Sequence, residues 1–222
     1  MEKPQIIDTA DGSKTLYLEQ MQEQYHSVNG AMTESDYVFI QKGFDYHKAT
    51  QPKVLEVGFG TGLNCLLTAI RAEKTKSKTV YFTTEKYPLD EQITRQLNYG
   101  SLISKEARLL FQKIHECEWE KMKQITTYFQ LCKLETDITK NRPIASDSCH
   151  IVYFDAFGPD KQPEMWTPAI FGRIFETTLH NGVFVTYSAK GAVRRQLTAI
   201  GFKAERLPGP PGKKEMLRGI KV

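Results

Sequence analysis

The sequence contains no long apolar run, no closely spaced cysteine pair and no low-complexity segment. No apolar stretch reaches the roughly 18 residues of a membrane-spanning helix, so we expect no membrane contact. Residues Met1 to Gln5 lack the apolar core of a secretory signal. None of the four cysteines lies in a C-x-x-C pair: Cys65, Cys117, Cys132 and Cys149. These absences argue against a zinc knuckle or a disulfide scaffold and predict a reducing, cytoplasmic location.

Metal-binding spacing is missing as well, because no two of the five histidines are separated as metal ligands usually are. We therefore expect no metal. The remaining composition is ordinary: the chain has 222 residues, of which 40% are hydrophobic and 25% charged. Such a chain is typical of a globular protein with one main domain. We expect that domain over residues 51–222, after an N-terminal β-extension over residues 1–50.

The charge is divided unevenly along the chain, although the formal net charge is only +4. From Lys190 to Val222 there are nine basic and two acidic residues, a net charge of +7. The preceding 189 residues carry −3. One end of the chain is therefore basic, and the rest is mildly acidic.

Strands alternate with helices along most of the chain, which predicts an α/β fold with a mostly parallel sheet. We expect strands over residues 14–18, 37–40, 54–57, 80–84, 131–134, 151–154, 183–187 and 216–222. We expect helices over residues 63–72, 89–97, 117–129, 171–179 and 192–200.

A glycine-rich loop follows the strand at 54–57. It reads Glu56-Val57-Gly58-Phe59-Gly60-Thr61-Gly62, and glycines there allow backbone amides to approach a ligand at a helix N-terminus. The dinucleotide fingerprint G-x-G-x-x-G does not fit, because the third glycine comes one residue early. The pattern E-x-G-x-G-x-G is instead typical of S-adenosylmethionine-dependent methyltransferases.

Three further acids follow successive predicted strands, at the sheet edge where such folds bind ligands. Glu85 is positioned to accept from two ribose hydroxyls, and Asp137 from the adenine amine. Asp155 faces the same crevice after the strongest apolar strand. Because Glu85 would also suit a nicotinamide cofactor, hydride transfer stays open as an alternative.

Several sequence blocks together resemble the MnmC/MnmD-type tRNA (5-methylaminomethyl-2-thiouridine)-methyltransferase family. The blocks run in order along nearly the whole chain: Asn29-Gly30 with Glu34-Ser35-x-Tyr37-Val38-Phe39, Gly58 to Asn64, Glu85-Lys86-Tyr87-Pro88, Asp155-Ala156-Phe157, Pro163-x-Met165-Trp166, Ser188-Ala189-x-Gly191-x-Val193-Arg194-Arg195 and Lys213-Lys214-Glu215-Met216. The last three blocks are not general to methyltransferases.

The resemblance implies a Rossmann-like class I fold with a seven-stranded sheet and an N-terminal β-extension that helps to cover S-adenosylmethionine. It implies conversion of 5-aminomethyl-2-thiouridine to 5-methylaminomethyl-2-thiouridine in the anticodon region of tRNA. The chain shows no second glycine fingerprint for the flavin-dependent oxidase that many relatives carry. We therefore expect it to methylate only, downstream of a separate enzyme that supplies the aminomethyl-uridine.

We assign the candidate site residues as follows. Cofactor-binding residues are Glu56, Gly58, Gly60, Thr61, Gly62, Asn64, Glu85, Lys86, Asp137 and Asp155. Substrate-binding residues are Phe157, Trp166, Arg194, Arg195, Lys213 and Lys214. Asp155 is the catalytic candidate; because an ordinary aspartate is a weak base, with a pKa of about 3.9, we expect it to position the amine. Trp166 would stack on a base, or else only cap the core.

The basic residues Arg194, Arg195, Lys213 and Lys214 are predicted to contact tRNA phosphates. Two other functions remain compatible with the sequence. One is a catalytically silent RNA- or nucleotide-binding protein on the same fold. The other is a small-molecule amine methyl or aminopropyl transferase, as spermidine synthases are, although those lack the two basic blocks.

Overall fold

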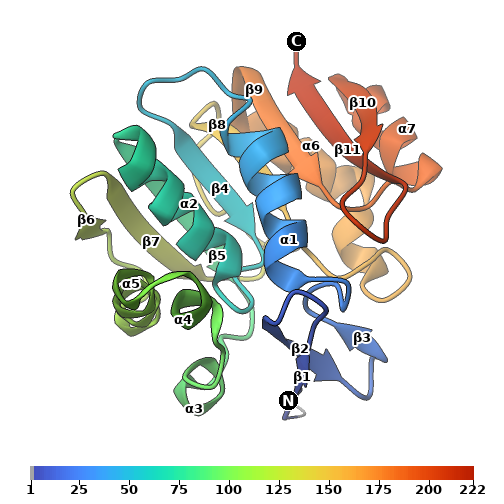
Figure 1. Cartoon of the computed structure of the whole chain (residues 1–222). Coiled ribbons are helices and arrows are strands. Elements are labelled where there is room, and N and C mark those ends of the chain that lie inside the picture. Colours follow the sequence, from blue (N-terminus) through green and yellow to red (C-terminus); the bar gives the residue numbers. More distant parts are fainter. Residues whose placement is uncertain (1–2) are drawn as a thin grey trace.

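The computed structural model describes residues 3–222; Met1 and Glu2, the first residues of the segment without signal character, lie outside it. A central sheet of eight strands has the order β10-β11-β9-β8-β4-β5-β7-β6. Helices cover both of its faces (Figure 1), and each face has its own cluster of buried apolar side chains. The α/β class and the mostly parallel sheet predicted from the sequence are confirmed.

Five strands of the sheet run parallel, and the edges carry antiparallel strands. The parallel strands are β4 (Lys53–Val57), β5 (Thr79–Glu85), β7 (Phe129–Glu135), β8 (Cys149–Phe154) and β9 (Thr178–Thr186). The antiparallel strands are β6 (Lys123–Thr126), β10 (Phe202–Pro208) and β11 (Glu215–Lys221). The chain passes from β4 outward to β5 and β7 and then returns to β8 on the other side of β4. This reversal is the place where open α/β sheets bind ligands.

The helices differ in which face of the sheet they cover. One face holds α1 (Ala31–Ser35) with its π-helical continuation η1 (Asp36–Phe44), α2 (Leu63–Thr75) and α5 (Lys105–Glu116). The other holds α6 (Pro168–Thr177) and α7 (Gly191–Ile200). Shorter helices are α3 (Glu91–Thr94), α4 (Tyr99–Ile103) and the 3-10 turn η2 (Pro163–Trp166). Between Asp137 and β8 the chain forms turns and no helix.

The sheet has eight strands and not the predicted seven, and the helix predicted over 117–129 is wrong. The helix in this region is α5, which begins at Lys105 and is capped by Ser104, whose side chain accepts a hydrogen bond from the Ala107 amide. It ends at Glu116, and residues 123–126 form β6 against β7. Ile125 and Thr126 are β-branched, and residues of this type favour strands.

The strand predicted over Tyr37–Ile40 is also wrong, because these residues belong to η1. An apolar run of this length fits a buried strand or a buried helix equally well. Here the run lies on the sheet face beside α2, and Val38, Phe39 and Ile40 are buried. Gly30 begins the helix with φ of 131°, a conformation that favours glycine.

A separate N-terminal sheet lies beyond the carboxyl ends of the parallel strands (Figure 1). It contains β1 (Gln5–Asp8), β2 (Lys14–Leu18) and β3 (Glu23–Gln24), all antiparallel. Asp11, in the turn between β1 and β2, accepts a 2.9 Å hydrogen bond from the Thr33 amide of α1. This contact fixes the small sheet to the helix that covers the central sheet.

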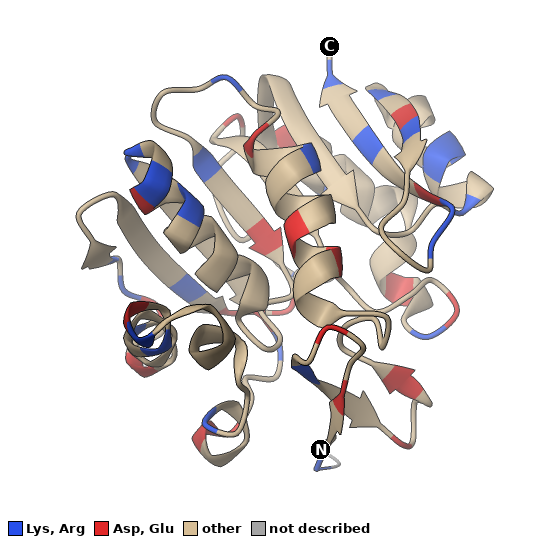
Figure 2. Ribbon diagram, in the orientation of Figure 1, with Lys and Arg blue, Asp and Glu red and all other residues tan. Residues whose placement is uncertain are grey.

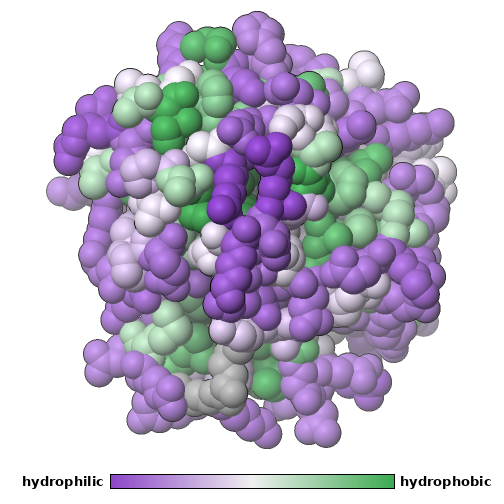
Figure 3. Space-filling view, turned by 180° about the vertical axis from the view of Figure 1, so that it is seen from behind, coloured by the Kyte–Doolittle hydropathy of each residue, from purple (hydrophilic) through white to green (hydrophobic). Residues whose placement is uncertain are grey.

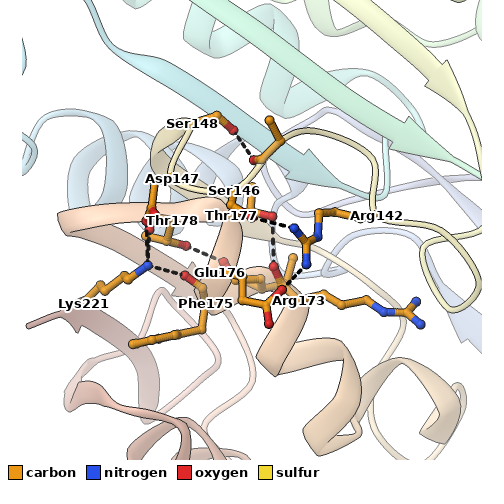
Figure 4. Close-up of polar contacts among 12 residues, drawn as sticks. Arg142, Ser146, Asp147, Ser148, Arg173, Phe175, Glu176, Thr177, Thr178 and Lys221 are labelled. Atoms are coloured by element: carbon orange, nitrogen blue, oxygen red, sulfur yellow. Dashed lines mark hydrogen bonds and ion pairs between the residues drawn. The ribbon is translucent and has the colours of Figure 1, made fainter.

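The opposite end of the molecule is fixed by Lys221, at the end of β11 (Figure 4). Its Nζ donates to the carbonyl oxygens of Phe175 (2.9 Å) and Thr178 (2.7 Å) and pairs with Asp147 (2.9 Å). A cation at a helix C-terminus interacts favourably with the helix dipole. The last strand and α6 are therefore joined at the end of the fold that lies away from the N-terminal sheet.

The surface opposite to the view of Figure 1 is mainly hydrophilic, and its hydrophobic residues form separate patches (Figure 3). Within residues 3–222, no helix combines the length and the apolar character needed to cross a membrane. All four cysteines are buried and free.

Candidate active site

The glycine loop connects β4 to α2 and lies against the end of β8. Gly58, Gly60 and Gly62 have φ of 93°, 49° and 76°, values that favour glycine. A Cβ atom on Gly58 would lie 2.7 Å from the Asp155 carbonyl oxygen, so a side chain there would force the two segments apart. The loop amides of Gly58 and Phe59 donate to the Thr84 carbonyl oxygen at 3.0 and 2.9 Å, which holds the loop against β5.

A cavity of about 580 Å³ opens at the carboxyl ends of β4, β5, β7 and β8. The glycine loop and the acids after the strands form one side, and residues 18–27 of the N-terminal sheet region form another. Of the predicted cofactor-binding residues, those on the cavity wall are Gly58, Gly60, Glu85, Lys86, Asp137 and Asp155. The folded chain therefore brings together residues that are spread over about a hundred positions in the sequence.

Glu85 lies where β5 ends, between the glycine loop and the following turn. Its carboxylate accepts hydrogen bonds from the amides of Gly60 (3.0 Å) and Tyr87 (2.9 Å). Burial raises its pKa, while these amides favour the ionised form. The arrangement holds a carboxylate at the wall of the cavity, as hydrogen bonding to two ribose hydroxyls requires.

Asp137 lies beyond β7 at the same wall. One carboxylate oxygen accepts from the hydroxyl (2.5 Å) and amide (2.9 Å) of Thr139, and the other lies 3.1 Å from Lys86 Nζ. The Thr139 hydroxyl is the main cause of a lowered Asp137 pKa, with Lys86 acting in the same direction. Asp137 is thus an ionised acceptor, suited to an exocyclic amine.

Asp155 lies at the centre of the site, where it follows β8 and is partly accessible from the cavity. Its Oδ2 accepts a 2.8 Å hydrogen bond from Asn64 Nδ2 on α2. Burial raises the Asp155 pKa to about 7, against the lowering effect of that hydrogen bond. The sequence-based expectation of an ordinary, weakly basic aspartate therefore does not describe this site, because the surrounding protein increases its affinity for a proton.

Four predicted cofactor-binding residues lie behind the cavity wall and support it. Glu56 is fully buried and accepts a 2.7 Å hydrogen bond from the Thr83 hydroxyl. Burial raises its pKa to about 8, so the side chain is mainly neutral at pH 7. Asn64 holds Asp155, and Thr61 and Gly62 form the turn into α2. We infer that these four residues shape the site from outside the cavity.

The predicted substrate-binding residues Phe157 and Trp166 lie in different environments. Phe157 is on the cavity wall, where its ring meets the edge of Tyr25 with ring centroids 5.0 Å apart. Trp166 is buried in the core beside Phe154, and its Nε1 donates to the Phe157 carbonyl oxygen at 2.7 Å. Trp166 therefore occupies the core-capping position that the sequence left open and supports Phe157.

The four basic residues predicted to bind tRNA also separate into two groups. Lys213 lies on the cavity wall, where it pairs with Glu34 of α1. Arg194, Arg195 and Lys214 are exposed and lie outside the cavity. Basic residues of α7, β10 and β11 gather on the right side of the molecule in Figure 2.

Sequence reasoning did not assign Tyr25, His26, Glu34 and Tyr187 to the site, although all four line the cavity. His26 and Glu34 lie close to or within the N-terminal block of the resemblance, which was the available signal. Tyr187 directly follows β9, and its hydroxyl donates to the Ala156 carbonyl oxygen at 2.9 Å. A position immediately after a parallel strand was the signal for Tyr187.

The residues of this site fit S-adenosylmethionine. The glycine loop gives close backbone access at the N-terminus of α2, and the carboxylates of Glu85 and Asp137 accept hydrogen bonds from uncharged hydroxyl and amino groups. The ligand carries an electrophilic methyl group on a positively charged sulfur. The negative charge of Asp155 would attract that sulfonium group. Within the described part of the chain, no group of three or more His, Cys, Asp or Glu side chains is placed to hold a metal ion.

Comparisons with known proteins agree with this interpretation. Two relatives, from Paraburkholderia phymatum and Actinobacillus pleuropneumoniae, are both named tRNA 5-methylaminomethyl-2-thiouridine biosynthesis bifunctional protein MnmC. They are 30% and 31% identical over 88% and 95% of this chain. The chain spans 32% and 34% of their lengths, about a third.

Two solved structures are similar to this chain to different degrees. The crystal structure of MNMC2 from Aquifex aeolicus superposes with a TM-score of 0.83 and 26% identity, covering 99% of this chain and 70% of that one. Spermidine synthase from Thermotoga maritima has a TM-score of 0.61 at 12% identity, covering 98% of this chain and 68% of that one, which shows a shared fold alone. The resemblance found in the sequence to MnmC/MnmD-type methyltransferases is confirmed.

A family described as S-adenosyl-L-methionine-dependent methyltransferase matches residues 103–222, more than half of the chain. Those residues include Asp137, Asp155 and Lys213 on the cavity wall. The chain therefore belongs to this family of S-adenosyl-L-methionine-dependent methyltransferases.

Proposed function

We propose that this protein methylates the amine of 5-aminomethyl-2-thiouridine at the wobble position of tRNA, giving 5-methylaminomethyl-2-thiouridine. The observation that carries the proposal is the position of Asp155, which Asn64 holds on the wall of a cavity that also contains Glu85 and Asp137 and fits S-adenosylmethionine. The names of the two relatives support the choice of tRNA as substrate.

The reaction forms a bond between the amine nitrogen and the methyl carbon while the methyl–sulfur bond breaks. An ammonium ion has no lone pair, so the amine must first lose a proton. Asp155, with a pKa of about 7, is partly ionised near neutral pH and suited to accept that proton. Asn64 fixes one carboxylate oxygen through its 2.8 Å hydrogen bond, which leaves the other oxygen for the amine.

The wall around Asp155 orients the remaining part of the substrate. Phe157 and Tyr25 offer aromatic surface for a nucleobase, with their own edge-to-face contact holding both rings in place. The exposed Arg194, Arg195 and Lys214 are the candidates for contact with tRNA phosphates. Because methyl transfer needs an existing amine, another active site must first form the aminomethyl-uridine. We place this reaction in the cytoplasm, in agreement with the four free cysteines.

The direct test is mass spectrometry of tRNA nucleosides after incubation with the purified protein, S-adenosylmethionine and tRNA that carries 5-aminomethyl-2-thiouridine. We expect 5-methylaminomethyl-2-thiouridine to form, and Asp155→Asn to lower kcat by about 100-fold or more. Cofactor affinity, measured by calorimetry, reports separately whether the variant still binds S-adenosylmethionine.

Three results would point to other functions. Methylation of free amines but not of tRNA would favour a small-molecule transferase, and use of a decarboxylated cofactor would favour aminopropyl transfer. Binding of tRNA without measurable S-adenosylmethionine binding would favour a silent binding protein. Wild-type activity in Asp155→Asn, with unchanged cofactor affinity, would remove Asp155 from the mechanism.

A further inference from the structure

Two residues 179 positions apart meet at the cavity wall next to Asp155. Lys213 comes from the turn between β10 and β11, and Glu34 from α1. Other contacts join the same two segments, since the Tyr37 hydroxyl donates to the Pro208 carbonyl oxygen at 3.0 Å. The C-terminal hairpin is thus held against the N-terminal helix on one side of the site.

The Lys213 ammonium group is held by groups of the site itself. It forms an ion pair with Glu34 Oε1, and its Nζ lies 4.0 Å from the centroid of the Tyr187 ring. Glu34 is almost fully buried, and its second oxygen accepts a 2.9 Å hydrogen bond from the Ser27 amide. An ammonium group with a buried carboxylate partner and an aromatic face is a poor candidate for a solvent-exposed phosphate contact.

The charges around Asp155 come from several elements. Glu34 favours the protonated form of Asp155 and Lys213 the ionised form, with burial and the Asn64 hydrogen bond as the larger effects. The titratable groups that interact with Asp155 are Glu34 of α1, Lys213 of the β10–β11 turn, Glu56 of β4 and Tyr187 after β9; Glu23 of β3 acts on Tyr187. Lys213 is the cation among these groups, and its lowering effect on the Asp155 pKa opposes the raising effect of Glu34.

We propose that Lys213 and Glu34 are a pair of positioning residues that set the protonation of Asp155, rather than a contact for tRNA phosphates. The proposal deepens the proposed function and rests on it, since the proton at Asp155 comes from the substrate amine. A lone lysine would hold Asp155 ionised and make it a poor proton acceptor. A lone glutamate would keep it protonated and unable to accept. The paired charges leave the carboxyl group able to gain and lose a proton near neutral pH.

The two halves of the pair have opposite expected effects on the pH profile. The acidic limb of kcat/KM follows the ionisation of the catalytic base in the free enzyme. Lys213→Met removes a cation that favours the carboxylate, so the limb should move to higher pH by about 0.5–1 unit. Glu34→Gln leaves Lys213 unpaired, so the limb should move to lower pH by a similar amount. The double variant should return toward the wild-type limb, and Lys213→Arg should retain it.

The matched control is Lys121→Met, which removes an exposed lysine that pairs with Glu118. If Lys213 instead contacts phosphates, Lys213→Met and Lys214→Met should both raise the KM for tRNA and leave the limb in place. That result would overturn the proposal. A shift of the limb in the same direction in Lys213→Met and Glu34→Gln would also overturn it, because it would indicate a shared loss of structure.

A second readout does not depend on catalysis. Carbon-13 NMR of a protein with labelled aspartate carboxyl groups follows Asp155 directly, and Asp155→Asn assigns its signal. The midpoint should move up in Lys213→Met and down in Glu34→Gln without tRNA present. If tRNA is not methylated but these shifts occur, the proposed function fails while the pairing survives. If tRNA is methylated and no shift occurs, only the pairing fails.

Discussion

The hydroxyl oxygen of Thr61, in the glycine loop, lies 2.6 Å from Nε2 of His26, which follows the N-terminal sheet. On the other side of the loop, Nε2 of His115 lies 3.2 Å from the Thr61 carbonyl oxygen. Burial lowers the pKa of both histidines to about 4, so both are neutral at pH 7. The loop that faces the cofactor is therefore held between two neutral imidazole rings from distant segments.

Removal of the first of these contacts should weaken cofactor binding. His26→Ala deletes the hydrogen bond to Thr61 and part of the cavity wall, and we expect a loss of roughly 1 kcal/mol, or about fivefold in Kd. Calorimetry with S-adenosylmethionine measures the effect, and His180→Ala, at an exposed histidine, is the control. An unchanged Kd in His26→Ala would mean that the contact does not fix the loop.

The same histidines predict a loss of stability in acid. His26 and His115 have folded-state pKa values of about 4 against 6.5 in the unfolded chain, so unfolding takes up protons between these values. The contribution of these two histidines to the free energy of unfolding should therefore fall as the pH is lowered from 6.5 toward 4. Urea denaturation at several pH values measures this slope. His26→Phe should reduce the slope, and an unaltered slope would show that His26 does not contribute.

Glu56 should contribute a pH dependence of the opposite sign. Its folded-state pKa of about 8 lies above the ordinary 4.5, so the folded protein holds the proton more tightly. The contribution of Glu56 to the free energy of unfolding is therefore complete below pH 4.5 and declines as the pH rises toward 8. Glu56→Gln keeps a neutral side chain of similar shape and should lack this decline. Its stability relative to wild type should therefore rise with pH across that window.

Urea denaturation of the two proteins across the same window checks the prediction. Glu135→Gln serves as the control for a glutamate-to-glutamine change, because Glu135 is exposed at the end of β7, which β5 separates from β4. A Glu56→Gln variant that is strongly destabilised below pH 4.5, where both side chains are neutral, would mean that shape and not charge governs this position.

Local sequence patterns were sufficient to predict the central part of the fold. The apolar runs that became β4, β5 and β8 are short and are followed by glycines or acids, as buried parallel strands often are. The glycine loop and the acids Glu85, Asp137 and Asp155 could be found because each lies at or just beyond the carboxyl end of a parallel strand. The carboxyl ends of parallel strands meet at one edge, which is why these positions converge.

Patterns that depend on tertiary packing were not predictable in the same way. The apolar residues of η1 fit a strand as well as a helix, and only their packing on the sheet beside α2 decides between them. The partners Glu34 and Lys213 are 179 residues apart, and no local signal shows that they meet. The raised proton affinity of Asp155 likewise comes from burial among distant segments, so the residue type alone predicted a weaker base.

The exposed arginines of α7 provide the clearest test of the tRNA-binding face. Arg194 and Arg195 lie in the basic C-terminal part of the chain and outside the cavity, so charge reversal should leave the cofactor Kd unchanged. Loss of phosphate contacts should raise the KM for tRNA and reduce the slope of log K against log salt by about one per contact. We expect the double variant Arg194→Glu/Arg195→Glu to raise the KM about tenfold or more at low salt, where these contacts are strongest.

Filter binding of tRNA over a range of salt concentrations, together with methylation kinetics, measures both quantities. Lys74→Glu reverses an exposed charge near the C-terminal end of α2, the end that points away from the glycine loop, and should change neither. If Lys74→Glu and the arginine variant weaken binding equally, the attraction comes from net charge and not from a defined face. If tRNA binding is independent of salt, the phosphate contacts assigned to α7 are wrong, and recognition must depend on the nucleobase at Phe157 and Tyr25.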